Sequence, residues 1–138
     1  MAESVRRLDY FVINVANKRG EGARVLQALA QEGVNLLAFT GFPGASGKAQ
    51  LDFVPEDGAA FRAAAERLKL RPRGPKTVFL IEGEDRAGAV GALLARLAEA
   101  RINVTAIDAL AAGSGRYCAM LWVKPKDVDQ AAAVLRAA

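Results

Sequence analysis

The sequence has no histidine and a single cysteine, Cys118, among its 138 residues. Without histidine, the chain offers no imidazole for acid–base catalysis or for metal binding. A single cysteine excludes a disulfide within the chain. We interpret Cys118, which lies in an apolar run, as a buried thiol in a protein from a reducing compartment. The remaining residues predict neither a cofactor nor a metal site.

Long apolar runs and a strong charge bias are also absent. No stretch approaches the ~18 consecutive apolar residues of a membrane-spanning helix. Asp9 and Asn14 interrupt the N-terminal segment, which therefore lacks the apolar region of a signal peptide. The net charge of +4 is too small to indicate a nucleic-acid-binding surface. We therefore expect a cytoplasmic, soluble protein that binds neither membranes nor nucleic acid.

What the sequence does contain is one pattern used twice. The clearer copy spans residues 84–104, where a charged turn and Gly88 precede leucines at helical spacing and a β-branched segment around Asn103. Gly20 and Asn35 repeat this arrangement 68 residues earlier. The same shift relates Lys18 to Arg86, Leu26 to Leu94, Leu29 to Leu97, Val34 to Ile102, and Ser46-Gly47-Lys48 to Ser114-Gly115-Arg116. A register kept at both ends of a helix indicates an internal repeat.

Each repeat predicts the order βαββαβ, which is the α+β, ferredoxin-like pattern of an antiparallel sheet with both helices on one face. The predicted strands are residues 8–15, 34–40, 49–54, 77–81, 102–110 and 116–123, and residues 69–76 form either a short strand or a linker. The predicted helices are residues 21–32, a helix capped by Asp57 that carries Phe61 and Leu68, residues 87–100 and residues 127–137. Leu26, Leu29, Leu94 and Leu97 are expected to be buried.

We place the first repeat at residues 1–72 and the second at residues 73–138. The second repeat then lacks its own fourth strand, which leaves one sheet edge open. Because open edges are normally protected, residues 1–7, residues 69–73 or a strand of another subunit should cover it. Pro72 argues against a long strand at 69–73, since proline donates no hydrogen bond to a ladder.

The motifs of the second repeat resemble those of the ACT-domain family, in which an apolar strand is followed by Asp-Arg-Pro-Gly, a helix with spaced leucines and Ile-Asn-Ile. The matching residues here are Asp85-Arg86-Ala87-Gly88, then Leu93, Leu94 and Leu97, then Ile102-Asn103-Val104. Alanine replaces the usual proline at position 87. In the first repeat the counterparts are Asn17-Lys18-Arg19-Gly20 and Val34-Asn35-Leu36, so the aspartate is missing. The resemblance covers nearly the whole chain.

The resemblance implies a regulatory protein that binds a free amino acid where the turn before the helix meets the start of the next strand, at an interface between two domains. The implied ligand-binding residues are Asp85, Arg86, Ala87, Gly88, Ala89, Asn103 and Val104, with Asn17, Gly20 and Asn35 in the first repeat. A helix N-terminus suits a carboxylate, and an asparagine side chain offers both donors and an acceptor. Individually, each of these residues is also explained as a turn or capping residue.

Three functions follow from this pattern. The first is a stand-alone, non-catalytic amino-acid sensor that assembles as a homodimer and acts allosterically on another protein. The second is a ligand-free module that uses the sheet only for dimerisation or protein interaction. The third is an acylphosphatase-like enzyme, which would pair Arg86 with Asn103 but whose Gly-x-Val-Gln-Gly-Val motif is missing. The residues favour the first.

Overall fold

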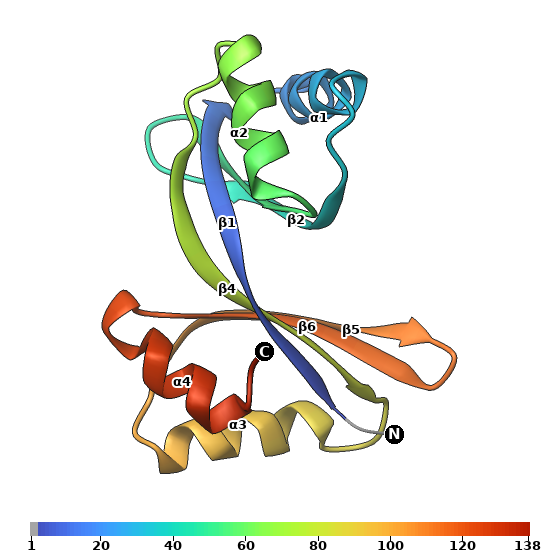
Figure 1. Ribbon diagram of the computed structural model, residues 1–138, viewed down its shortest axis with the longest axis vertical. Coiled ribbons are helices and arrows are strands. Elements are labelled where there is room, and N and C mark those ends of the chain that lie inside the picture. Colours follow the sequence, from blue (N-terminus) through green and yellow to red (C-terminus); the bar gives the residue numbers. More distant parts are fainter. Residues whose placement is uncertain (1–2) are drawn as a thin grey trace. The chain divides into compact units, whose positions relative to one another are not determined.

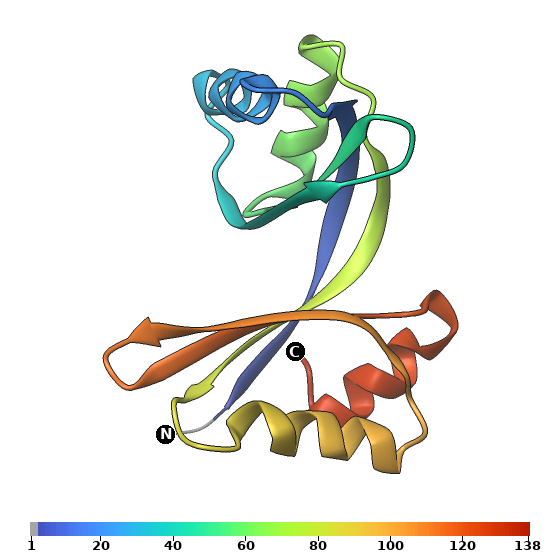
Figure 2. The same cartoon turned by 180° about the vertical axis from the view of Figure 1, so that it is seen from behind.

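The computed structural model describes residues 3–138, and residues 1 and 2 lie outside the described part. Its strands form one sheet in the order β2-β3-β1-β4-β6-β5. The chain divides into two compact units, one formed by Asp9–Lys76 and the other by the segment ending at Leu8 together with Thr77–Ala138. The α+β class and the two βαββαβ repeats predicted from the sequence are confirmed (Figures 1 and 2).

The unit Asp9–Lys76 contains the C-terminal part of strand β1 (Ser4–Ala16) and the start of β4 (Arg73–Glu84), together with α1 (Glu21–Gln31), β2 (Leu36–Pro43), β3 (Lys48–Pro55) and α2 (Gly58–Arg67). Its core is aromatic. The Phe11 and Phe61 rings stack with centroids 4.8 Å apart, and Phe53 lies 5.6 Å from Phe61. Asp57 caps α2 as predicted, since its carboxylate accepts hydrogen bonds from the first-turn amides at 3.0 and 3.1 Å.

The other unit contains the rest of β4, then α3 (Ala89–Glu99), β5 (Val104–Gly113), β6 (Arg116–Val123), a short 3₁₀ turn (Pro125–Asp127) and α4 (Val128–Leu135). Figure 1 shows α3 and α4 together on one face of its strands. Leu93 and Leu97 point into the core from α3, one helical turn apart, and Leu135 meets them from α4. Leu97 and Leu29 are buried as predicted, whereas Leu94 and Leu26 are half-buried rather than buried. None of the four is exposed, so the predicted helix register is kept.

The internal repeat persists in the strand register. Phe11 pairs with Phe53 on β1 and β3, and Phe79 pairs with Leu121 on β4 and β6, each residue 68 positions beyond its counterpart. The register shift between Leu36 and Ala38 on β2 recurs on β5. The repeat can therefore be used to compare the two units residue by residue.

The structure corrects the predicted repeat boundaries of 1–72 and 73–138. β1 begins at Ser4 rather than at residue 8, and its first residues up to Leu8 belong to the unit of the second repeat, where Val5 joins the core. Residues 69–76 were predicted as a strand or linker separate from 77–81, but a single strand, β4, runs from Arg73 to Glu84. The apolar character of β4 was recognisable, but the pairing of distant segments was not.

The open edge of the second repeat is covered by Ser4–Leu8, because β1 is the neighbour of β4 on the side opposite β6. Of the three candidates, the N-terminal one is therefore correct for its described residues. Backbone bonds with Ala138 protect this segment in turn: the Arg7 amide donates to the Ala138 carbonyl at 3.0 Å and the Ala138 amide donates to Val5 at 2.9 Å. Cys118 on β6 is half-buried rather than fully buried as predicted.

None of the described helices is both long enough and apolar enough to span a bilayer. Among the described residues, no group of three or more aspartate, glutamate and cysteine side chains is placed to hold a metal ion.

Candidate functional site

The turn between β4 and α3 holds the residues of the Asp-Arg-Ala-Gly motif. Asp85 and Arg86 are exposed, and the Asp85 amide donates to the Gly115 carbonyl at 2.9 Å, which fixes the turn to the β5–β6 loop. Gly88 is the N-cap of α3 and has φ +83°, a conformation that favours glycine. A Cβ at Gly88 would meet no atom within 4 Å, so the glycine is required by the backbone angle rather than by space.

The N-terminus of α3 has no side-chain cap among the described residues. Asp85 therefore does not serve as the helix cap, which was one of its possible structural explanations. The Ala89 amide donates to the Arg86 carbonyl at 3.2 Å, which leaves the amides of Val90 and Gly91 for solvent or a ligand. The helix dipole adds partial positive charge at this end. This end of α3 suits a carboxylate.

A cavity of about 300 Å³ opens beside this helix end. One wall is formed by the β4–α3 turn and the start of α3. The other wall is formed by the end of the edge strand β5 and by the Tyr117 ring on β6. Its polar residues are Asp85, Arg86 and Tyr117, and its other lining residues are Gly88, Ala89, Val90, Gly91, Ala109, Leu110 and Ala111. The cavity thus joins a polar rim to apolar walls.

Asn103 and Val104 lie away from this cavity. Asn103 follows the C-terminal end of α3 and is exposed, and Val104 begins β5. The 11 residues of α3 separate Asn103 from Gly88, a distance along the helix axis of about 16 Å. Figure 2 shows α3 running from beside the β5–β6 turn to the opposite side of the unit, where the chain enters β5. One copy of this unit therefore does not bring the two halves of the predicted site together.

Within one copy, the same separation also keeps apart the pair on which the acylphosphatase-like alternative depends. Arg86 precedes α3 and Asn103 follows it, so these two side chains of one copy do not converge on one reacting group.

The first repeat has the equivalent parts. Gly20 has φ +91° at the N-cap of α1, the Asn17 amide donates to Gly47 at 2.9 Å, and a cavity of about 310 Å³ lies between this turn and β2. Asn35 again lies at the far end of the helix. Its side-chain amide donates to the Glu56 carboxylate at 3.1 Å, so this asparagine is already engaged.

Asn103 has a different neighbour at the position equivalent to Glu56. Val104 pairs with Val123, so Asn103 and Lys124 are the next residues outward on two antiparallel strands. A cation stands where the first repeat has a carboxylate. Glu21 is a second difference between the repeats, because it lines the cavity of the first repeat. Its carboxylate pairs with Arg24 at 3.0 Å, and this hydrogen bond lowers the pKa of the Glu21 carboxyl. Alanine, Ala89, occupies the corresponding position in the second repeat.

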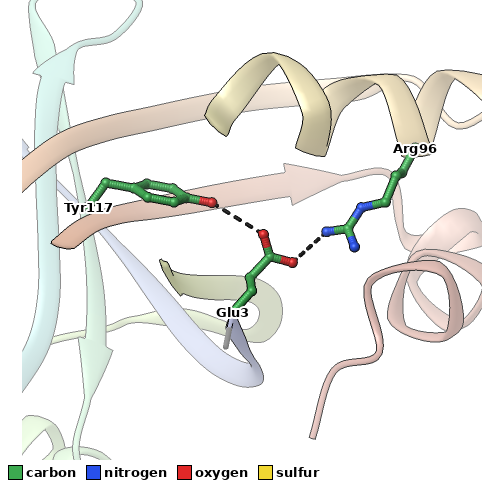
Figure 3. Close-up of polar contacts among 3 residues, drawn as sticks. All are labelled: Glu3, Arg96 and Tyr117. Carbon is green, nitrogen blue, oxygen red and sulfur yellow. Dashed lines mark hydrogen bonds and ion pairs between the residues drawn. The ribbon is translucent and has the colours of Figure 1, made fainter. Parts of the chain in front are cut away.

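Sequence reasoning missed Tyr117, Glu3 and Arg96. Tyr117 is 5% exposed and lines both the cavity beside β5 and a second cavity of about 280 Å³ beyond it. Its hydroxyl donates to Glu3, which Arg96 also contacts (Figure 3). Burial first, and then the Glu3 carboxylate, raises the pKa of Tyr117, so the phenol stays protonated and able to donate. The sequence contained one signal for Tyr117: the 68-residue shift aligns this tyrosine with Ala49 of the first repeat.

The fold has counterparts among solved structures. Protein BT0572 from Bacteroides thetaiotaomicron matches with a TM-score of 0.80 at 19% identity, over 97% of this chain and 88% of that one. The regulatory subunit of aspartate kinase from Thermus thermophilus, in a ligand-free form, matches with a TM-score of 0.63 at 16% identity, over 98% and 93%. Aspartokinase III from E. coli, in complex with lysine and aspartate, matches with a TM-score of 0.56 at 18% identity, over 99% of this chain and 32% of that one.

No protein-family model matches the sequence, and no curated protein is significantly similar to it. At these identities the solved structures establish the fold. That fold is the tandem ACT arrangement implied by the resemblance of the motifs.

Proposed function

We propose that this chain binds a free α-amino acid as a regulatory ligand and has no catalytic role of its own. The observation that carries the proposal is the cavity beside the uncapped N-terminus of α3, lined by Asp85, Arg86, Gly88 and Ala89 from the motif. The ligand carboxylate meets Arg86 and the amides of Val90 and Gly91, and Asp85 faces the ammonium group. The lysine and aspartate bound by E. coli aspartokinase III, which shares the fold, support an amino acid as the ligand class.

In this proposal a second copy of the chain completes the site. β5 is an edge strand, and Leu110 on it is 62% exposed. Antiparallel pairing of two β5 strands about a twofold axis sets the start of one strand beside the end of the other. Asn103, which precedes β5, then reaches the cavity wall at Ala109–Ala111 of the second copy. A homodimer therefore joins the two half-sites that α3 keeps apart.

The second repeat is the better candidate for this site. In the first repeat, Asn35 is bonded to Glu56, and Glu21 places a carboxylate at the cavity where the ligand carboxylate would lie. In the second repeat, Asn103 has Lys124 beside it and Ala89 leaves the helix end uncharged. Asn17 and Gly20 keep their positions in the fold but act, on this proposal, as turn residues.

On this proposal, the output of binding passes to another protein or to a change of assembly. We include in the proposal the cytoplasmic location expected from the sequence. If a protein partner prefers the liganded form, the ligand raises the affinity for that partner. By linkage, the partner must raise the affinity for the ligand by the same factor.

A thermal-shift screen of the twenty amino acids tests this function. A ligand at ~100 times its dissociation constant should stabilise the chain by about 2.7 kcal/mol. The competing function is a ligand-free dimerisation module, which the exposed Leu110 on the sheet edge would also serve. A dimer in size-exclusion chromatography with no stabilising amino acid would establish that alternative and refute ours.

A further inference from the structure

Tyr117 is held against the backbone of its cross-strand neighbour. Gly83 on β4 pairs directly with Tyr117 on β6. A Cβ at Gly83 would lie 2.6 Å from Cε1 of the tyrosine, so the ring occupies the space that any other residue at 83 would fill. In the first repeat the corresponding pair is Val15 on β1 and Ala49 on β3. There the larger side chain lies on β1, the counterpart of β4.

Two further side chains hold the far end of the ring (Figure 3). The Tyr117 hydroxyl donates to Oε2 of Glu3 at 3.4 Å, and Arg96 of α3 donates to Oε1 of the same carboxylate at 2.5 Å. The ring is thus fixed by β4 beneath it and by a carboxylate tied to α3. A side chain fixed in this way makes a wall rather than a movable lid.

The ring stands between two cavities. The cavity of about 300 Å³ beside β5 and the cavity of about 280 Å³ next to Gly83, Leu93 and Arg96 both include Tyr117 in their lining. In the first repeat, one cavity of about 310 Å³ extends from the turn past Ala49 to Val15, the counterpart of Gly83. In the second repeat, Gly83 lines only the cavity of about 280 Å³, and Tyr117 stands at the boundary that this cavity shares with the one beside β5.

We propose that Tyr117 determines the specificity of this cavity by limiting it to α-amino acids with short, branched aliphatic side chains. This inference rests on the proposed function and adds the class of ligand. With its carboxylate and ammonium at the turn, the ligand directs its side chain toward Val90 and Leu110, which are apolar. A longer chain would have to displace the Tyr117 ring. A charged side chain would lose its hydration against these walls.

Calorimetric titration of the intact chain with valine and with methionine tests the inference. The parent should bind valine at least about tenfold more tightly than methionine, a discrimination that a shaped apolar pocket can supply. Tyr117→Ala should open the second cavity and remove or reverse that preference. If Tyr117→Ala does not fold, Tyr117→Leu serves as the second variant. It keeps an apolar side chain on β6 and should also weaken the preference for valine. Tyr117→Phe keeps the ring and should retain the parental preference.

The outcomes separate this inference from the proposed function. If the parent binds valine and Tyr117→Ala or Tyr117→Leu keeps the parental ratio of valine to methionine affinities, Tyr117 does not set specificity although the function stands. A parent that prefers methionine to valine overturns the inference in the same way. If neither the parent nor any variant binds any of the twenty amino acids, the proposed function fails and the inference fails with it.

Discussion

If the ligand site is shared between two copies, damage to its two halves can be separated and then complemented. Asn103→Ala removes the half contributed from the start of β5, and Ala89→Glu damages the half at the turn. Neither change should disturb folding. Asn103 is exposed and makes no side-chain hydrogen bond to a described residue. Glutamate already occupies the equivalent position in the first repeat, as Glu21 in the first turn of α1, where an acid is favourable.

The expected losses follow from the contacts. Asn103 would contribute one or two charge-assisted hydrogen bonds, each worth about 1.5–3 kcal/mol, so Asn103→Ala should weaken binding at least about tenfold. Ala89→Glu opposes the ligand carboxylate directly and should weaken binding at least as much. Asn35→Ala is the matched control, because it changes the same residue type in the repeat whose asparagine is bonded to Glu56. It should leave ligand affinity unchanged.

Mixing the two damaged variants provides the decisive measurement. In a dimer of one Asn103→Ala copy and one Ala89→Glu copy, one site has both halves intact and the other has both damaged. After subunit exchange at equal concentrations, calorimetry should recover parental affinity at about a quarter of all sites, since half of the dimers pair unlike copies. A mixture that binds no better than its components would refute the shared site. Parental binding by Asn103→Ala, with loss in Asn35→Ala, would transfer the site to the first repeat.

Four further changes test the site and the packing of the two units. Gly88→Val should abolish binding and destabilise the fold by about 1–2 kcal/mol in denaturant unfolding, because φ at Gly88 is +83°. Leu110→Lys should convert the proposed dimer to a monomer in analytical ultracentrifugation. It should change the unfolding free energy of the monomer itself by less than about 0.5 kcal/mol, since Leu110 is 62% exposed in the single chain. Leu97→Ala should cost about 2–5 kcal/mol, because the side chain is fully buried, and a smaller loss would contradict the packing of α3. Burial raises the pKa of Asp52 above its usual value although Gln50 donates a hydrogen bond to it, so the stability that its protonated form contributes is lost as pH rises through the raised pKa. Asp52→Asn should remove that part of the pH dependence and melt higher than the parent at neutral pH, and an unchanged profile would show that this carboxyl does not titrate with folding.

The sequence was sufficient to predict the repeat and its elements because those depend on local pattern. Leucines at helical spacing fixed α1 and α3, and the glycines before them marked the turns. The 68-residue shift extends to individual strand pairs, as Phe11 with Phe53 and Phe79 with Leu121 demonstrate. The covering of the open edge was harder to predict. Ser4–Leu8 contain one apolar core residue, Val5, between polar neighbours, and their pairing with β4 joins segments far apart in sequence.

The position of Asn103 relative to the turn needs a different explanation. Asn103 and the turn belong to one motif, and the resemblance placed the ligand where they meet, at an interface between two domains. The two parallel strands of a right-handed crossover run in the same direction, however, so the end of the first and the start of the second lie at opposite ends of the connecting helix. The separation across α3 follows from topology alone. Tyr117 was missed for another reason, since only the pairing with Gly83 reveals that its ring forms a wall.

Because the proposed site is divided between the two ends of α3, its ligand would link two copies of the chain. A ligand that contacts the turn of one copy and Asn103 of another binds the dimer more tightly than the separated chains. By linkage, it must then strengthen association by the same factor for each site. Two sites related by the twofold axis double the free energy that binding adds to the interface. On this proposal the β5 edge alone holds two copies together only weakly, so the assembled fraction would depend on ligand concentration. Such a chain reports the amino acid through its own assembly, and any partner that recognises the paired β5 edges responds to that signal.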